Sequence, residues 1–266
     1  MSDAAPSLSP LAGQHALVTG GARGIGGAIV DELARLGASV TILDINAPVL
    51  IDKAAALTAR GVRVATAVAD ITEPGSVDQA FKAAEAAFGP PQILVNNAGV
   101  ADPAPFLKTS VQTWRRILDI NLNGAFHCTQ RALPAMMKAN YGRVIATAST
   151  AGLIGYRYSA AYCASKHGVV GLTRALALEF AKTAITVNCV CPGFTDTAIV
   201  AEAVSNITSK TGRSANEARA SLASYNPQGR IVAPTEIAMV VGWLALPASG
   251  SITGQAIPVA GGEVMS

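Results

Sequence analysis

The chain has 266 residues, of which 50% are hydrophobic and 14% are charged, and its formal net charge is +3. This length suits one large α/β domain, and the apolar content excludes an intrinsically disordered chain. The positive charge is too small and too scattered for a nucleic-acid-binding surface. Because charged residues are scarce against a typical ~25%, we expect part of the surface to be buried against other subunits.

Residues 1–12 are predicted to form a flexible tail, and they lack the basic and apolar regions of a signal peptide. The apolar run from Ile237 to Leu246 is about half a membrane span. The four cysteines form no CxxC pair, which favours reduced thiols and a cytoplasmic protein over a disulfide framework. The three histidines have no metal-ligand spacing, so no metal site is predicted.

Short β-rich runs alternate with longer helical patterns along the chain. Strands are predicted at His15–Thr19, Ser39–Asp44, Val62–Val68, Ile93–Asn97, Arg143–Ser149, Ile185–Cys191 and Gln255–Val259. Helices are predicted near 24–36, 47–59, 74–88, 110–139, 159–182 and 234–246. Several strands are continuously apolar, as strands buried on both faces are, and the alternation predicts a parallel sheet covered by helices on both sides.

No repeat or linker marks a second domain, so residues 13–266 are taken as one domain. Residues 198–225 are helical and Ala-rich but interrupt the alternation. An insertion that follows a strand end is a candidate lid, here over about residues 195–225.

A glycine-rich turn, TGGARGIG, closes the first strand at residues 19–26. Gly20, Gly24 and Gly26 permit a tight turn and let the backbone approach a pyrophosphate, which the N-terminus of the next helix then binds. Glycines at such a turn can also serve packing alone. Asp44 strengthens the nucleotide interpretation, because a carboxylate at the end of the second strand binds ribose hydroxyls and repels a 2′-phosphate.

Two further residues near this turn have two interpretations each. Arg23 is either a cation that tolerates NADP or a solvated surface arginine. Asp70, after the third strand, either contacts adenine or acts as a turn or N-cap residue.

Tyr162 and Lys166 stand four residues apart and therefore share one face of a helix. A nearby ammonium stabilises a phenolate and lowers the phenol pKa from ~10, so that the tyrosine can exchange a proton with an alcohol or ketone. Such a pair is common by chance on protein surfaces. Ser149 adds weight because it ends a strand at the sheet edge where α/β proteins bind ligands.

Together these motifs resemble those of the short-chain dehydrogenase/reductase family, from about residue 12 to residue 262. The motifs occur in the family's order: TGGARGIG at 19–26, Asp44, Asp70, NNAG at 96–99, Asn121 in ILDINLNGAF, Ser149, Tyr162-x-x-x-Lys166, CPGFTDT at 191–197 and ITGQ at 252–255. One departure is Ala260, which stands where members often carry aspartate, with an expected effect on packing or assembly.

The resemblance implies a single doubly wound Rossmann-type domain with a mostly or wholly parallel seven-stranded sheet, a helical lid insertion and a homotetramer. It implies that Ser149 orients the substrate oxygen and that Tyr162 is the general acid/base. Lys166 then lowers the tyrosine pKa and binds the nicotinamide ribose, and Asn121 supports a water in a proton relay. Taken singly, Asn97 and Asn121 are also explained as a turn residue and a helix-disturbing residue.

Two sets of binding residues follow from the resemblance. The cofactor set is Gly20, Arg23, Gly24, Ile25, Gly26, Asp44, Asp70, Ile71, Asn97, Ala98, Gly99, Tyr162, Lys166, Pro192, Gly193, Thr195 and Thr197. The substrate set is Ser149, Ala151, Tyr156 and Tyr162.

The expected reaction is hydride transfer between NAD and a secondary alcohol or ketone, with NADP the less favoured coenzyme. The positions that flank the catalytic groups are nearly all apolar or aromatic: Val100, Ala101, Ala151, Leu153, Tyr156, Phe194, Ile199 and Val200. This composition predicts a neutral substrate with an apolar or aromatic body. A buried substrate carboxylate needs a cation, for which Arg157, Lys210 and Arg213 are the candidates.

Two alternatives remain at this point. The same machinery serves 3-oxoacyl thioesters or 3-hydroxy acids, although the glutamine and histidine that bind the carboxylate in 3-hydroxybutyrate dehydrogenases are here Ala101 and Thr150-Ala151. A non-catalytic nucleotide-binding regulator is the other alternative, and the filled catalytic positions argue against it.

Overall fold

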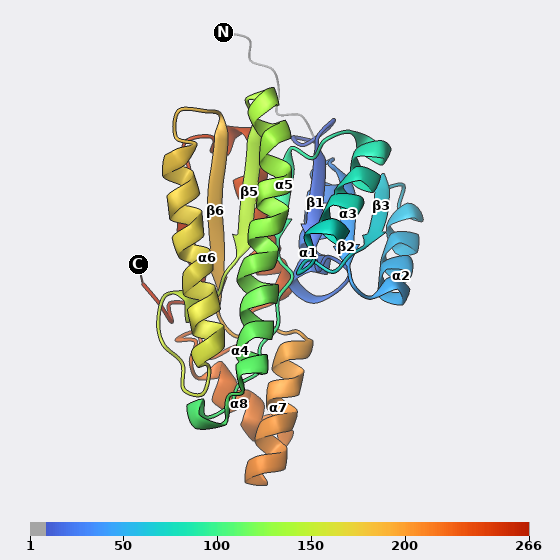
Figure 1. Ribbon diagram of the computed structural model, residues 1–266. Coiled ribbons are helices and arrows are strands. Elements are labelled where there is room, and N and C mark those ends of the chain that lie inside the picture. The colour runs from blue at the N-terminus through green and yellow to red at the C-terminus, as the bar shows by residue number, and fades with distance from the viewer. Residues whose placement is uncertain (1–8, 266) are drawn as a thin grey trace.

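A computed structural model describes residues 9–265 of the chain. Its seven strands form one wholly parallel sheet in the order β3-β2-β1-β4-β5-β6-β7, covered by helices on both faces (Figure 1). The strands are β1 His15–Thr19, β2 Ser39–Asp44, β3 Val64–Val68, β4 Ile93–Asn96, β5 Gly142–Thr147, β6 Ile185–Pro192 and β7 Ala256–Val259. The doubly wound α/β fold predicted from the sequence is confirmed.

The helices follow the predicted pattern with shifts of one or two residues at most ends. They are α1 Gly24–Arg35, α2 Ala47–Thr58, α3 Pro74–Phe88, α4 Val111–Leu118, α5 Gly124–Ala139, α6 Ala160–Glu179, α7 Ala198–Thr211, α8 Ala215–Ala223 and α9 Pro234–Ala245. Short 3₁₀ turns occur at Phe106–Lys108, Thr150–Gly152 and Pro247–Ser249.

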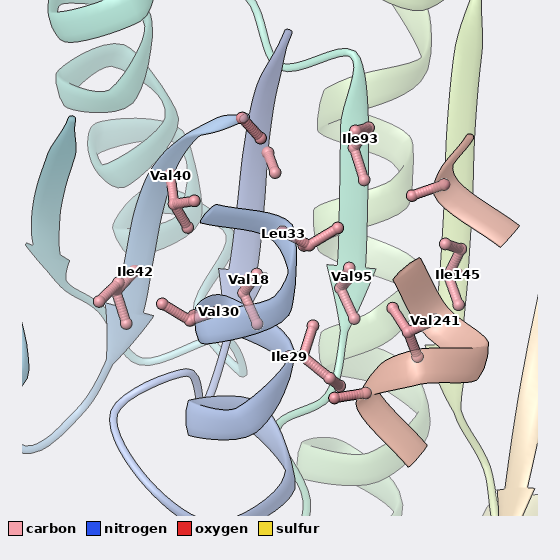
Figure 2. Close-up of a cluster of buried hydrophobic side chains, with 14 of the residues drawn as sticks. Val18, Ile29, Val30, Leu33, Val40, Ile42, Ile93, Val95, Ile145 and Val241 are labelled. Carbon is pink, nitrogen blue, oxygen red and sulfur yellow. The ribbon is translucent and has the colours of Figure 1, made fainter. Parts of the chain in front are cut away.

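Two hydrophobic clusters fix the layers on either side of the sheet. On one face, α1 and α9 pack over β1, β2, β4 and β5 through branched apolar side chains, including Ile29, Val30, Leu33 and Val241 (Figure 2). On the other face, α3 and α5 pack through Phe81, Cys128 and Met136. Because both faces are covered, the central strands are buried throughout, as their continuous apolar runs indicate.

The strand order reverses between β1 and β4, and this reversal positions the site. Chain segments that leave β1 and β4 at their carboxyl ends diverge to opposite faces and open a crevice, where α/β proteins bind ligands. The helices α7 and α8, from the insertion after β6, extend beyond this same edge of the sheet (Figure 1).

Two expectations need correction. The single helix predicted over 110–139 is divided by a π-helical turn, Asp119–Asn123, between α4 and α5. The tail predicted over 1–12 is too long, because Leu11 is fully buried and its N–H bonds the Leu36 carbonyl at 2.9 Å. Residues 1–8 lie outside the described part of the chain.

The lid segment, α7 and α8, is helical as predicted, and its role as a lid remains a prediction. Within residues 9–265, no helix is both long and apolar enough to cross a membrane. All four cysteines are free thiols.

Candidate active site

The glycine-rich turn leaves its backbone open to a ligand. Gly20 and Gly24 adopt φ of 60° and 56°, in the left-handed region that favours glycine. A Cβ on Gly26 would lie 2.1 Å from the Gly20 carbonyl oxygen, so no side chain fits there. Within the described residues, the Arg23 side chain makes no capping hydrogen bond to α1. The N–H groups in the first turn of α1 can therefore bind an anion. A dinucleotide pyrophosphate fits this cradle.

Asn97 holds the turn in place and is itself occupied by protein contacts. Its Nδ2 donates to the carbonyl oxygens of Thr19 and Gly20, both at 3.1 Å. Its Oδ1 accepts from the Thr147 hydroxyl at 3.3 Å, while Thr19 Oγ1 accepts from the N–H groups of Asn97 and Ala98. The side chain therefore ties together the ends of β1, β4 and β5.

The acidic residues predicted for the adenosine half lie at neighbouring strand ends. The Gly21 N–H donates to the Leu43 carbonyl at 3.3 Å, which sets Asp44 directly beside the glycine-rich turn. Asp70 uses Oδ1 to accept from both the N–H and the hydroxyl of Thr72, so it acts as a turn residue here.

Two other predicted cofactor residues differ in their surroundings. Ile71 is buried and packs where a Cβ on Gly124 would clash with it, so its side chain belongs to the core. Arg23 is exposed at the start of α1.

The segment after β6 crosses toward the glycine-rich turn. Thr197 lies with its methyl group 3.4 Å from the position of a Cβ on Gly24. The Thr195 hydroxyl donates to the Gly193 carbonyl at 2.9 Å, and the Gly193 N–H donates to Val259 at 3.2 Å. These bonds fix Pro192–Thr197 opposite α1, across the crevice at the sheet edge.

Ser149, Tyr162 and Lys166 come together from β5 and α6. The Ser149 hydroxyl donates to the Pro192 carbonyl at 3.4 Å and lies near enough to the Tyr162 hydroxyl to influence its pKa. Lys166 Nζ donates to the Thr147 carbonyl at 2.7 Å and lies 5.7 Å from the centre of the Tyr162 ring.

Burial governs the proton affinities of this group. It lowers the pKa of Lys166 to about 8, because a buried ammonium loses its hydration. It raises the pKa of Tyr162, and the Ser149 hydrogen bond offsets that rise only partly. Burial thus acts against the expected lowering of the Tyr162 pKa by Lys166, and that lowering stays a prediction.

Asn121 lies in the π-helical turn with its side chain fully engaged. Its Oδ1 accepts from the Val100 N–H at 2.8 Å, and its Nδ2 donates to the Val100 carbonyl and to Ser165 Oγ. The side chain links α5 to the NNAG segment and to the catalytic helix α6. Because the Asn121 side chain is occupied, a relay water would have to bind to the main chain of this turn.

The predicted substrate positions meet around an aromatic cluster. Tyr156, Phe194 and Tyr225 contact one another with ring centres 5.3–6.2 Å apart. Ala151 is buried beside Ser149, to whose hydroxyl oxygen its N–H donates at 3.1 Å. The three candidate cations, Arg157, Lys210 and Arg213, are all exposed.

Two residues of this region, Tyr225 and Glu263, are not among those predicted from the sequence. The Tyr156 hydroxyl donates to Glu263 Oε1, and it bonds Thr150 Oγ1 at 2.7 Å. A signal was present, because Glu263 follows β7 at the edge where the carboxyl ends of all the parallel strands meet.

The fold and the site define a Rossmann-fold oxidoreductase that binds a nicotinamide coenzyme. Residues 14–208 match the family described as short chain dehydrogenase, and the chain belongs to this family. It is 35% identical over 255 residues to D-beta-hydroxybutyrate dehydrogenase of Cupriavidus necator, covering 96% of this chain and 99% of the relative.

Two more relatives share nearly the whole chain. The cis-4-hydroxycyclohexanecarboxylate dehydrogenase of Sinomonas cyclohexanicum is 38% identical over 248 residues, covering 93% of this chain and 95% of the relative. A solved actinorhodin polyketide ketoreductase with NADPH is 35% identical with a TM-score of 0.91, covering 94% and 97% of the two chains.

Proposed function

We propose that this enzyme interconverts a neutral secondary alcohol and its ketone with NAD as the coenzyme. The observation that carries the proposal is the convergence of Ser149, Tyr162 and Lys166 on the crevice beside the glycine-rich turn. The bound coenzyme supplies the hydride acceptor or donor at its nicotinamide ring. In the oxidation, the carbinol carbon gives up a hydride and its hydroxyl gives up a proton, so that ketone, reduced coenzyme and one proton result.

Each catalytic side chain has a role that its contacts support. Tyr162 takes the hydroxyl proton, and Ser149, which lies near the Tyr162 hydroxyl, orients the reacting oxygen. Lys166 supplies a cation that stabilises the tyrosinate and binds the nicotinamide ribose. Asn121 supports a water in the proton relay through the main chain of its π-helical turn.

The coenzyme preference rests on Asp44. Its carboxylate ends β2 beside the glycine-rich turn, where it can accept hydrogen bonds from the ribose diol of NAD. The 2′-phosphate of NADP would instead face this negative charge. The exposed Arg23 moderates the preference by offering a cation nearby.

The substrate preference rests on the walls of the site. Tyr156, Phe194 and Tyr225 present aromatic surface, and the candidate cations for a substrate carboxylate are exposed. A secondary alcohol or ketone with an apolar or aromatic body suits these walls. The likeness to D-beta-hydroxybutyrate dehydrogenase favours a second candidate, a 3-hydroxy acid or 3-oxoacyl thioester on the same machinery. We also place the enzyme in the cytoplasm as a homotetramer, with small-molecule substrates as its partners rather than nucleic acid or membranes.

The Tyr162→Phe variant tests the catalytic assignment. It keeps the aromatic ring and removes the proton-carrying hydroxyl. We expect turnover to fall by at least ~10²-fold while NADH binding survives, since general acid–base catalysis contributes about that factor. The measurement is absorbance at 340 nm across a panel of alcohols and ketones, with fluorescence titration of NADH as the folding control. A variant that keeps more than a tenth of wild-type turnover contradicts the role of Tyr162.

The same panel decides the substrate class. It compares an aryl ketone, acetoacetate and an acetoacetyl thioester by kcat/KM. We expect the aryl ketone to be preferred, because the aromatic walls receive its ring and the three candidate cations for a substrate carboxylate are exposed. A tenfold preference for either acetoacetyl compound would establish the second candidate instead.

A further inference from the structure

A carboxylic acid stands at the wall of the proposed substrate pocket with one oxygen unused. Glu263 Oε1 accepts the hydrogen bond of the Tyr156 hydroxyl, which also bonds Thr150. Glu263 Oε2 is shielded from solvent and has no hydrogen-bond partner within the described residues. A buried carboxylate oxygen without a donor is costly, and native proteins supply such atoms with a partner.

The position of Glu263 ties this oxygen to the reacting groups. Thr150 directly follows Ser149, and Gly193 directly follows Pro192, whose carbonyl accepts from Ser149. A Cβ on Gly193 would lie 2.8 Å from Glu263 Oε2, so the carboxyl group rests against that glycine. Glu263 is therefore linked through Tyr156 to Thr150, the residue after Ser149. It also rests against Gly193, the residue after Pro192.

The contacts around Glu263 leave it an acceptor. Burial raises the pKa of Tyr156, so this phenol keeps its proton and donates it to Glu263. Burial also raises the pKa of Glu263, and the Tyr156 hydrogen bond opposes that rise. Arg157, the residue after Tyr156, is exposed, and a second carboxylate that entered here would face the unpartnered oxygen of Glu263.

The aromatic cluster stands beside Glu263, because Tyr156, which bonds Glu263, belongs to it. Tyr225 is 51% exposed and contacts both Tyr156 and Phe194, and it follows the end of α8 in the lid segment. For a ligand to reach the Glu263 carboxylate from the side of the lid, the half-buried Tyr156 and Phe194 rings and the exposed Tyr225 ring must rotate away from it.

Building on the proposed function, we propose that Glu263 is a specificity-determining residue for the substrate. The substrate carries an O–H or N–H donor at the end remote from its reacting carbon, and this donor pairs with the Glu263 carboxylate. Substrates that carry a carboxylate at that end are rejected. The site thus prefers substrates that carry a hydrogen-bond donor at this end, rather than the purely apolar substrates that the sequence predicts.

A matched panel of cyclohexanols tests this selectivity. The compounds carry a methyl, hydroxyl, amino or carboxylate group at position 3 or 4, as cis and trans isomers, and kcat/KM is measured with the coenzyme that supports turnover. We expect a hydroxyl or amino compound to exceed its methyl counterpart by tenfold or more, and every carboxylate to be the poorest. The hydroxyl and amino arms distinguish a neutral donor from a cationic one.

Two substitutions connect the selectivity to Glu263. Glu263→Met removes the acceptor, and we expect the ratio of the preferred donor compound to its methyl counterpart to fall at least tenfold. Glu263→Gln keeps a partner for Tyr156 but removes the charge, so discrimination against the carboxylate should fall at least tenfold. Glu202→Gln, an exposed carboxylate on α7, is the matched control and should leave both ratios as in the wild type.

The outcomes separate this inference from the proposed function. An enzyme that transfers hydride to or from no alcohol or ketone contradicts both. An enzyme that oxidises cyclohexanols with no donor preference, or with ratios unchanged in both Glu263 variants, contradicts the inference alone. If alcohols outside the panel are oxidised but none within it, the panel is run as competitive inhibitors, and the inhibition constants must follow the same order for the inference to stand.

Discussion

Lys166 is a buried cation whose titration falls close to neutral pH. Its pKa of about 8 lies below that of an unfolded lysine, ~10.4. Between these two values the unfolded chain binds the extra proton, so the free energy of unfolding rises as the pH rises. The buried charge therefore destabilises the fold most below pH 8, where Lys166 carries the ammonium that the proposed mechanism uses beside Tyr162.

Replacing Lys166 with methionine removes this titration while filling a similar volume. From pH 7.5 to pH 10, we expect the free energy of unfolding of the wild type to rise by about 2 kcal/mol relative to Lys166→Met. Urea unfolding of both proteins at several pH values gives this difference. A difference that stays constant or falls with pH would show that Lys166 is not desolvated in the folded protein.

Asp44 is the residue on which the coenzyme preference depends. We expect NAD to exceed NADP by tenfold or more in kcat/KM, because the carboxylate accepts from the ribose diol and repels the 2′-phosphate. Asp44→Ala should lower the ratio of kcat/KM with NAD to kcat/KM with NADP, mainly by raising kcat/KM with NADP. Asp52→Ala, an exposed acid on α2, is the control. A wild type that prefers NADP refutes the assignment.

The site residues predicted from the sequence fall into two groups, those whose side chains meet at the site and those whose side chains make structural contacts instead. Ser149, Tyr162 and Lys166 come together because strand ends and helix spacing fix where side chains lie. Asn97 and Ile71 lie in the predicted region, but the Asn97 side chain connects strand ends and the Ile71 side chain packs in the core. The position of Glu263 after β7 placed it at the carboxyl edge of the sheet, but its contact with Tyr156, 107 residues away in the sequence, is not visible in any local pattern.

At the scale of elements, the turn between β1 and α1 has the strictest requirement. Gly26→Ala would place a methyl group 2.1 Å from the Gly20 carbonyl oxygen, so the turn must open. We expect the NADH dissociation constant to rise at least tenfold, and overpacking to cost about 1–3 kcal/mol of stability. Fluorescence titration of NADH and thermal unfolding measure the two effects.

Gly75→Ala is the matched control for this turn. A Cβ there meets no atom within 4 Å, and Gly75 lies in the first turn of α3. The substitution should leave NADH affinity unchanged and stabilise the protein by up to about 1 kcal/mol, because alanine loses less backbone entropy in a helix. If Gly26→Ala binds NADH as the control does, the turn is not the coenzyme cradle.

Local pattern placed the elements well but not their irregularities. Period and propensity do not distinguish a π-helical turn from the α-helix on either side, so the break at Asp119–Asn123 went unpredicted. The last crossover was equally hidden. β7 extends the sheet in the same direction as β6, yet α9 packs with α1 on the face opposite α6, which gives this crossover the reverse hand. Right-handed crossovers are the rule, and packing on α1 overrides it here.

At the scale of the whole molecule, large apolar side chains are exposed on two sides. One set lies on α5 and α6 and includes Phe126, Met137 and Leu178, the last 81% exposed. The other lies on α9, across the sheet, with Met239 and Trp243. Because two-fold interfaces pair the same patch on both subunits, we expect two separate patches of this kind to generate a tetramer of dihedral symmetry.

Light scattering at micromolar concentration should therefore give about four times the chain mass of 27.0 kDa. Leu178→Glu places a charge in the first patch and Trp243→Glu in the second, and burying either charge without a partner is unfavourable. Each variant should stop at a dimer, held by the patch left intact, and the double variant should be a monomer. A wild type that is monomeric, or single variants that remain tetrameric, would mean that these apolar faces are not subunit interfaces.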